Sequence, residues 1–447
     1  MGALRTNMRG LLNKVIREGV GFDRLLDQLE ANASMSTDDM REYQLAALKR
    51  LLQHCNTNVP YYSRLFKKCN FDPDEVQDLR DIEKLPLLTK QDVKKNFHEL
   101  IAVNANKKIC RIGHTSGTTG SPAHFYRDVQ SIILENAALW RFWQASGFSI
   151  GEKRVTLRGD NVGAPQHGRY WVYNMFENQL IMSSLHLSRA NITAYYQKIK
   201  GFQAKALQAY PSSAYILAKF LADAGQTVRF EHIFTSSEPF SSEVRELIEH
   251  QLGGKVWDMY GMAERVVLAT ECAAHSGLHI NEDYSYVELV DRDGKVTDFE
   301  GTVVGTTLYN YAMPLLRYVT NDMGELIPGE CACGWKMKRL KPIETKAEDV
   351  IWTSDGRWIS PAAIAAVLKT LHFVFESQVI QVELDRIVVK IVPEIGYTDD
   401  QTRILLDGLR QRLGPGVKID VERVGSIPRT AAGKFRRIVN EIHRECG

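Results

Sequence analysis

Residues 114–122 read His-Thr-Ser-Gly-Thr-Thr-Gly-Ser-Pro, a stretch that combines hydroxyl side chains and glycines with little other chemistry. Gly117 and Gly120 lack a Cβ atom, so the backbone there can take left-handed angles and approach an anion closely. Further hydroxyl donors come from Thr115, Ser116, Thr118 and Thr119. The common P-loop has a lysine directly after its last glycine, and this stretch has none. It therefore predicts a loop that binds nucleotide phosphates, although taken alone it is equally typical of a surface turn.

The length and charge of the chain limit its class. Its 447 residues exceed the size at which a single hydrophobic core stops growing, so two or more domains are expected. The 56 basic and 54 acidic residues include no basic block, which argues against a nucleic-acid partner. No apolar run approaches the roughly 20 residues of a membrane span, and the start of the chain lacks a signal-peptide layout. Seven scattered cysteines do not indicate a disulfide framework, so we expect a cytoplasmic protein.

The order of apolar and polar residues predicts an α/β architecture. The first hundred or so residues alternate apolar and charged positions at helical spacing. Between residues 108 and 340, β-rich runs such as 154–157 and 232–235 alternate with helical stretches such as 213–224 and 241–252. Two later β-rich runs, 284–289 and 302–309, have antiparallel character, and Asp293-Gly294 marks a hairpin turn.

A second pattern begins after residue 340. It predicts, in order, a strand at 350–352, a turn at 354–356, a helix at 361–371, strands at 377–383 and 386–392, and a helix at 399–413. A segment of this length can form a small domain of its own. We therefore expect a large α/β domain of mixed sheets with flanking helices over residues 1–342. A small α+β domain should follow over residues 343–447, after a short hinge.

Three further motifs carry candidate chemistry. In Tyr260-Gly261-Met262-Ala263-Glu264, a ring can lie against a nucleotide base and an acid can lie near a metal-bound phosphate. Asp322 can accept hydrogen bonds from both hydroxyls of a ribose. Lys434 follows Gly433 in a basic segment near the C-terminus and can stabilise developing negative charge. Each motif alone is compatible with an ordinary turn or a solvated basic tail.

These four motifs in this order resemble the adenylate-forming superfamily of acyl-CoA synthetases, luciferases and nonribosomal adenylation domains. The resemblance spans residues 58–438 and is strongest to the phenylacetate-CoA ligase branch, which includes the ligases of capsular polysaccharide clusters. Four stretches carry the likeness to this branch: Asn58-Val59-Pro60-Tyr61-Tyr62, residues 84–90, Tyr210-Pro211-Ser212 and residues 313–318.

The resemblance implies a role for each motif. It implies that Thr115–Gly120 hold the β- and γ-phosphates of ATP, and that Ser237, Glu238 and Pro239 line the adenine pocket. Tyr260, followed by Gly261, would stack on the purine. Glu264 would bind Mg²⁺, and Asp322 would bind the ribose. Lys434 would contact the carboxylate and the α-phosphate, with the C-terminal domain moving between the two half-reactions.

The chain departs from the family pattern at two places. The hinge motif of the family, Gly-Arg-x-Asp-Asp, is replaced by Thr345-Lys346-Ala347-Glu348-Asp349, in which Lys346 stands for the arginine. Because lysine is a poorer bidentate phosphate donor than arginine, we expect an effect on domain rotation or on the second half-reaction. The other departure is Ala123, where many relatives carry a lysine; other members of the branch also lack that lysine.

Three cysteines and a histidine form a candidate metal site. Cys272, His279, Cys331 and Cys333 supply the ligands of a closed tetrahedral zinc site. A buried free cysteine is also a common core residue, and His275 is an alternative ligand. Such a zinc ion would be structural and would clamp the loop of residues 271–279.

The predicted reaction is ATP-dependent activation of a carboxylic acid to an acyl-adenylate with release of pyrophosphate, followed by acyl transfer. Coenzyme A is the default acceptor, while the phosphopantetheine of an acyl carrier protein or an amine fits equally well. Rings at Tyr170, Trp171, Tyr173 and Phe176 favour an aryl acid. Packing of these rings in the core is at least as good an interpretation, and Arg158, Arg169 and Lys198 leave room for an anionic acid. The alternatives are an adenylyltransferase or a non-catalytic nucleotide-binding protein, and a homodimer is compatible with the sequence.

Overall fold

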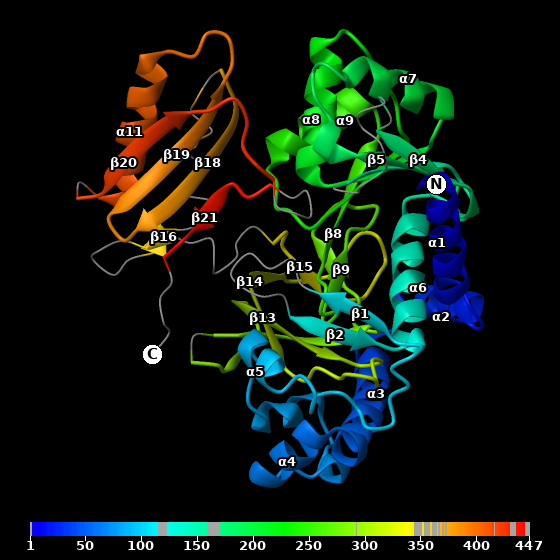
Figure 1. Cartoon of the computed structure of the whole chain (residues 1–447). Coiled ribbons are helices and arrows are strands. Elements are labelled where there is room, and N and C mark those ends of the chain that lie inside the picture. The colour runs from blue at the N-terminus through cyan, green and yellow to red at the C-terminus, as the bar shows by residue number, and fades with distance from the viewer. Residues whose placement is uncertain are drawn as a thin grey trace. The chain divides into compact units, whose positions relative to one another are not determined.

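The chain forms two compact units in a computed structural model (Figure 1). One unit contains Met1–Thr320 and Gly324–Pro342, and the other contains Ile343–Gly447 with the short stretch Asn321–Met323. The structure describes residues 2–114, 123–158, 162, 168, 170–291, 293–343, 351–352, 358–359, 364, 367–368, 371, 373–414, 416–429 and 435–442.

The N-terminal hundred residues are helical, as the periodicity predicts. The elements are α1 (Gly2–Arg17), α2 (Phe22–Asn32), α3 (Thr37–Asn58), α4 (Pro60–Lys68), the 3₁₀ turns η1 (Pro73–Glu75) and η2 (Leu79–Lys84), and α5 (Lys90–Lys95). Side chains fix several helix starts: the Ser36 hydroxyl accepts the backbone N–H of Asp39, and Thr89 forms a capping box with Asp92. None of the described helices is long and apolar enough to cross a bilayer.

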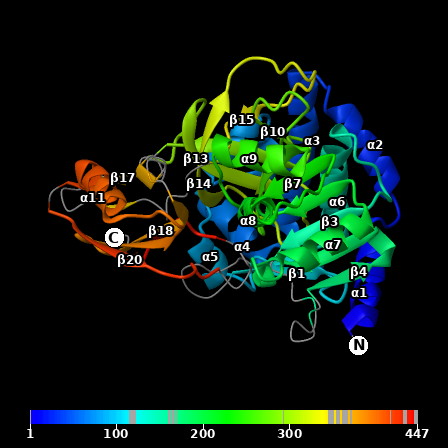
Figure 2. The same cartoon turned by 90° about the horizontal axis from the view of Figure 1, so that it is seen from above.

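The described part of the large unit contains a 13-stranded sheet. Its parallel half has the spatial order β5 (Gln179–Ser183), β3 (Arg154–Arg158), β6 (Ala206–Ala209), β7 (His232–Ser236) and β8 (Lys255–Gly261). At one edge, β4 (Trp171–Asn174) pairs antiparallel with β5. Helices α7 (Ile192–Phe202), α8 (Pro211–Asp223) and α9 (Ser242–Leu252) connect consecutive parallel strands (Figures 1 and 2). This alternation of strand and helix confirms the predicted α/β pattern.

The rest of this sheet is antiparallel. Its strands are β9 (Leu268–Thr270), β10 (Leu278–Ile280), β15 (Arg339–Leu340), β14 (Tyr318–Ile327), β13 (Glu300–Thr307), β11 (Ser285–Val290) and β12 (Val296–Thr297). The hairpin predicted at Asp293-Gly294 joins β11 to β12. A separate two-stranded ribbon pairs β1 (Arg111–His114) with β2 (His124–Arg127).

Helix α6 (Val129–Ala145) packs against the sheet through aromatic side chains. Phe142 contacts Phe234 and Trp257 edge to face, with ring centroids 5.7 and 6.3 Å apart. Helix α2 also packs on α6, and Leu26 joins the same buried cluster. Figure 1 shows α1, α2 and α6 side by side. One hydrophobic cluster of this unit therefore lies between α6 and the parallel strands.

A buried ion pair joins α6 to the rest of the unit. The Arg141 guanidinium donates two hydrogen bonds to the Asp283 carboxylate, at 2.7 and 2.9 Å, and both side chains are almost completely buried. Arg141 also donates to the Leu29 carbonyl and to Asn281 Oδ1. Asn32 Nδ2 donates to Asp283 at 3.2 Å. One charged pair therefore links α6, α2 and the segment after β10.

The small unit is an α+β fold, as expected. Its four-stranded sheet has the order β20 (Lys418–Arg423), β19 (Arg386–Pro393), β18 (Val374–Glu383) and β21 (Ile438–Asn440), and α11 (Asp399–Leu413) packs on it through Leu405, Leu409 and Leu413. A short ribbon pairs β16 (Ile351–Trp352) with β17 (Trp358–Ile359). The turn at 354–356 and most of the helix at 361–371 lie outside the described residues.

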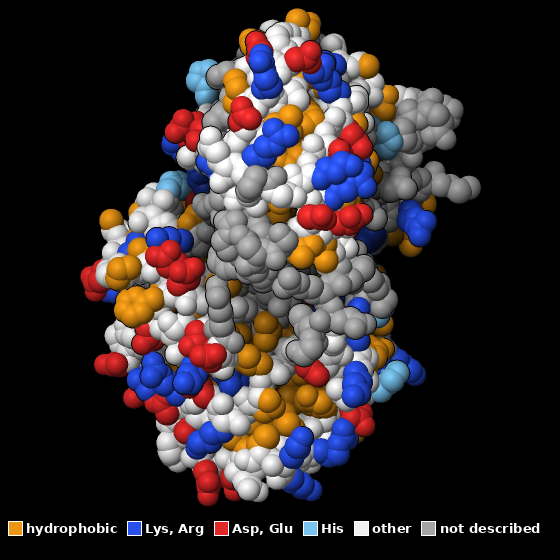
Figure 3. Space-filling model, turned by 90° about the vertical axis from the view of Figure 1, so that its left-hand side faces the viewer, with side chains coloured by type: hydrophobic (Ala, Val, Ile, Leu, Met, Phe, Trp, Pro, Cys, Tyr) orange, Lys and Arg blue, Asp and Glu red, His pale blue; other side chains and the backbone are white. Residues whose placement is uncertain are grey.

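The face shown in Figure 3 carries interspersed basic and acidic side chains. This mixture agrees with the near balance of 56 basic and 54 acidic residues in the sequence.

Arg141→Leu should reduce the free energy of unfolding of the large unit by about 3–5 kcal/mol, because it leaves the Asp283 carboxylate buried without its partner. Urea unfolding followed by tryptophan fluorescence measures this loss, since Trp140, Trp143 and Trp257 lie in the core. The matched control is Arg189→Leu, whose pair with Asp223 is exposed and should contribute less than about 1 kcal/mol. Equal losses for the two variants would contradict the structural role of Arg141.

Candidate active site

The parallel strands end at one edge of the sheet, where open α/β sheets bind ligands. Arg158 is the last residue of β3, and its Nη2 donates to the hydroxyl of Ser236, the last residue of β7, at 2.9 Å. The same guanidinium lies 5.2 Å from the ring centroid of Tyr210, which follows β6. Three neighbouring strands therefore present polar and aromatic groups at this edge.

The predicted adenine-lining residues begin at this edge. Ser236 is paired with Met259, so Ser237 and Tyr260 follow adjacent positions of β7 and β8. Ser237 has a φ of 73°, a left-handed angle that is uncommon for residues other than glycine. Pro239 is exposed, and Tyr260 and Gly261 are partly buried at the end of β8.

Glu238 has a local structural role that the sequence did not indicate. Its buried carboxylate accepts the backbone N–H of Ser212 at 3.0 Å, in the first turn of α8. A carboxylate at a helix N-terminus is stabilised by the unpaired N–H groups there. Glu238 therefore fixes the position of α8 relative to the segment that follows β7.

The carboxylate of Glu264 is held by Tyr318. The Tyr318 hydroxyl donates to Glu264 Oε1 at 3.0 Å, and the Tyr318 side chain is buried. Phe125 of β2 packs edge to face on the Tyr318 ring, with centroids 6.3 Å apart. The predicted magnesium ligand is therefore positioned by the first residue of β14 and, through it, by the ribbon that carries the predicted phosphate loop.

Arg127 is a second residue near Glu264 that the sequence did not reveal. Its guanidinium donates to the carbonyl of Ala263. Burial and the nearby positive charge of Arg265 lower the pKa of Arg127 to about 10, so it stays charged at neutral pH. A Cβ atom at Gly113, on the facing strand of the ribbon, would lie 2.2 Å from this guanidinium. A side chain at position 113 would therefore require the Arg127 guanidinium to shift.

The structure describes only some of the remaining predicted site residues. Asp322 is buried on β14, four residues after Tyr318. His114 and His124 are paired across the ribbon, so the two ends of the predicted phosphate loop lie side by side. Other predicted residues lie outside the described part of the chain, and their roles stay predictions: Thr115, Ser116, Gly117, Thr118, Thr119, Gly120, Lys346 and Lys434.

The rings after β3 mostly pack on one another. Tyr170 stacks on Tyr195 at 5.6 Å, and Trp171 meets Tyr195 edge to face at 6.3 Å. Tyr173 contacts Phe202 of α7. Tyr170 and Trp171 are half-buried and Tyr173 is exposed, so these rings pack on neighbouring side chains at the edge of the sheet and not in the core. Phe176, by contrast, lines a cavity, and Arg169 lies outside the described residues.

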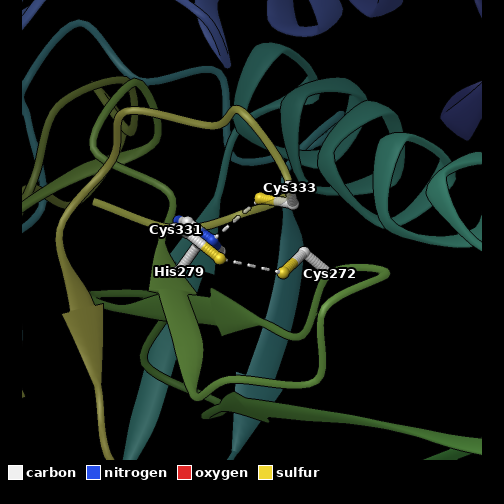
Figure 4. Close-up of side chains that lie close together, drawn as sticks. All are labelled: Cys272, His279, Cys331 and Cys333. Atoms are coloured by element: carbon white, nitrogen blue, oxygen red, sulfur yellow. Dashed lines mark hydrogen bonds between the residues drawn. The ribbon is translucent and has the colours of Figure 1, made fainter.

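The structure brings together all four predicted ligands of the Cys/His cluster (Figure 4). Cys272 follows β9, His279 is on β10, and Cys331 and Cys333 lie between β14 and β15. Their ligand atoms all lie within 4.8 Å of one another. The sulfurs of Cys272 and Cys331 are 3.6 Å apart, close to the roughly 3.8 Å expected for two thiolates on one tetrahedral zinc ion.

The hydrogen bonds and burial of the cluster also suit a metal. His279 Nδ1 donates to the Met337 carbonyl at 3.0 Å, which leaves Nε2 facing Cys333 Sγ at 3.4 Å. Burial lowers the pKa of His279 to about 4 and raises the pKa of Cys272 to about 12. The imidazole is thus a neutral ligand, and a bound cation would hold the thiols as thiolates. His275, the alternative ligand, instead forms a hydrogen bond between its Nδ1 and Glu271 Oε2 at 3.1 Å.

Comparisons with known proteins agree with this architecture. The family described as the CapK C-terminal domain matches residues 351–441. Protein CapK of Staphylococcus aureus is 27% identical over 415 residues, which cover 91% of this chain and 90% of the relative. Phenylacetate-coenzyme A ligase of Escherichia coli is 28% identical over 435 residues, which cover 92% and 97%.

A solved structure of 2-hydroxyisobutyryl-CoA ligase, in complex with R3-HIB-AMP, has the same fold. Its TM-score is 0.72 at 21% identity, with 92% of this chain and 91% of that chain covered. This likeness confirms the predicted fold class. Together with the sequence relatives, it supports the adenylate-forming superfamily, and within it the branch of the phenylacetate-coenzyme A ligases and CapK, as the group to which this chain is similar.

Proposed function

We propose that the protein is an AMP-forming ligase that activates a carboxylic acid with ATP and then transfers the acyl group to a thiol. The observation that carries this proposal is the Glu264 carboxylate, fixed by Tyr318 beside the carboxyl ends of the parallel strands. Relatives over nine-tenths of the chain are named phenylacetate-coenzyme A ligase, which supports an acid as substrate and coenzyme A as acceptor. An acyl carrier protein or an amine is an alternative acceptor.

The first half-reaction joins two anions. A carboxylate oxygen attacks the α-phosphorus of ATP, the bond from that phosphorus to the bridging oxygen breaks, and pyrophosphate leaves. Mg²⁺ bound by Glu264 would supply positive charge at the phosphates. Lys434, on the small unit, would neutralise charge at the reacting carboxylate and α-phosphate. Residues 115–120 would hold the departing phosphates, and Asp322 would hold the ribose.

The second half-reaction uses the acyl-adenylate. The thiolate of coenzyme A attacks the acyl carbon, the acyl–oxygen bond breaks and AMP leaves. We propose that residues 1–342 bind ATP and the acid, while residues 343–447 form a mobile domain that presents Lys434 in the first step. Lys346 would contact phosphate near the hinge.

We also propose that Cys272, His279, Cys331 and Cys333 hold a structural zinc ion. Four protein ligands close the coordination sphere, which leaves no position for substrate. Such an ion would tie the loop after β9 to the turn before β15. Its contribution would be to the stability of the large unit, with no part in catalysis.

Exchange of pyrophosphate into ATP should depend on a carboxylic acid, and Lys434→Ala should slow it by about 100-fold or more. The assay screens a panel of acids and then measures thioester formation with coenzyme A. Lys418→Ala, which removes an exposed lysine from β20, is the matched control and should leave exchange unchanged. ATP binding without exchange for any acid would refute the ligase in favour of a nucleotide-binding protein. Exchange without thioester would indicate an adenylyltransferase or another acceptor.

Tyr318→Phe should slow exchange about five- to tenfold at limiting Mg²⁺, because Glu264 loses a hydrogen bond of about 1 kcal/mol. Saturating Mg²⁺ should restore most of the rate if Tyr318 acts by positioning the metal ligand. Tyr170→Phe serves as the control, because it removes a hydroxyl that donates a hydrogen bond to Asn191 and not to Glu264. A loss that is the same at all Mg²⁺ concentrations would contradict this role.

Protein purified without chelator should contain about one zinc ion per chain, measured by plasma mass spectrometry. Cys333→Ser should lower the zinc content and the melting temperature, because it removes one of four ligands. Cys69→Ser changes a cysteine outside the cluster and should alter neither. Wild-type protein free of zinc would rule out the site.

A further inference from the structure

A cavity of about 450 Å³ lies in the large unit between α1, α6 and the strands β3, β5 and β6. Helix α1 forms its outer wall and is tied to the end of β4 by Asn7, which donates to the Tyr173 carbonyl and accepts from the Met175 N–H. Figures 1 and 2 both show α1 beside β4. The volume is in the range of small-molecule sites.

The sheet face that lines this cavity is polar. Thr156 donates to Gln208 at 3.2 Å and accepts from Gln179 at 2.7 Å, so the three side chains form a hydrogen-bonded row across β5, β3 and β6. On the same face, β7 and β8 carry Phe234 and Trp257, which pack on α6. A sheet face covered by helices is normally apolar. The side chains on this face therefore change from apolar on β7 and β8 to polar on β6, β3 and β5, where the cavity lies.

The cavity also has an excess of positive charge. Six basic side chains line it: Arg9, Lys14, Arg17, Arg154, Arg158 and Arg265. Three acidic side chains lie among them, and each is paired with a base: Glu18 with Lys14, Glu177 with Arg154, and Glu135 with Arg265. The Arg154 Nε atom, in a side chain that is 8% exposed, has no hydrogen-bond partner among the described residues. The lining thus suits an anionic group.

The cavity adjoins the candidate active site at two points. Arg158 lines the cavity and also donates to Ser236, the residue before the predicted adenine-lining segment. Arg265 lines it from the other side and directly follows Glu264. An acid whose carboxylate reacts beside Glu264 can therefore extend its far end into the cavity. Of the rings once expected to select an aryl acid, Phe176 lines this space, while Tyr170, Trp171 and Tyr173 pack elsewhere.

We propose that this cavity receives the distal end of the acid and selects carboxylic acids that carry a second anionic group. The inference rests on the proposed function and specifies its substrate class. Arg9 reaches the cavity from α1 and contributes to this selection, while Arg5 on the same helix does not line the cavity. The two arginines therefore form a matched pair for mutation.

Pyrophosphate exchange should be measured with succinic, glutaric and adipic acids, with butyric, valeric and hexanoic acids, and with phenylacetic acid. We expect kcat/KM for the best diacid to exceed that of its matched monoacid and of phenylacetic acid at least about tenfold. Arg9→Gln should raise KM for the diacid several-fold and leave KM for the monoacid unchanged. Arg5→Gln should change neither.

The outcomes separate the two proposals. Exchange that favours monoacids or phenylacetic acid, or an equal response of Arg9→Gln to both acid types, would overturn the selection of diacids and leave the ligase intact. Exchange with none of the acids, in protein that still binds ATP, would overturn the ligase and this inference with it. A melting temperature of Arg9→Gln equal to that of Arg5→Gln excludes misfolding as the cause of any difference.

Discussion

The buried ion pair between Arg141 and Asp283 is the interaction on which the large unit depends. Two charges removed from water are costly unless their hydrogen bonds are complete, and here Leu29, Asn32 and Asn281 supply the additional partners. The network admits one position of α6 relative to α2 and β10. The Arg141 guanidinium also lies 5.8 Å from the ring of Trp335, which packs edge to face on His279. The helical wall and the Cys/His cluster are therefore positioned by the same pair.

The candidate active site draws on both halves of the sheet. The parallel half contributes strand ends, where Arg158, Ser236 and Tyr260 come together because parallel neighbours finish at one edge. The antiparallel half contributes Tyr318, whose hydroxyl orients Glu264. The position of the candidate active-site residues thus depends on strand pairing in both halves of the sheet. The Cys/His cluster lies where the antiparallel strands β9, β10 and β15 meet.

The elements that could be predicted from sequence are those with a local cause. Helix α11 begins at Asp399 and ends at Leu413 as expected, because its apolar residues recur at helical spacing. The Cys/His cluster was predictable because three thiols and an imidazole together make up the ligand set of a closed zinc site. The bonds of Arg127, Arg141 and Tyr318 join positions more than 50 residues apart, and no local pattern marks them. Aromatic rings look alike in sequence whether they line a pocket or fill a core.

The polar row of Gln179, Thr156 and Gln208 needs an explanation that stability alone does not supply. Thr156 is buried and the two glutamines are half-buried, and mutual hydrogen bonds hold the three side chains in position. The apolar residues of β7 and β8 on the same face instead pack directly on α6. The cavity beside this row is lined with polar and basic groups, among them Arg158, which donates to Ser236, and Arg265, which follows Glu264. The side chains on this face thus change from apolar to polar beside the cavity that we propose for the distal end of the acid.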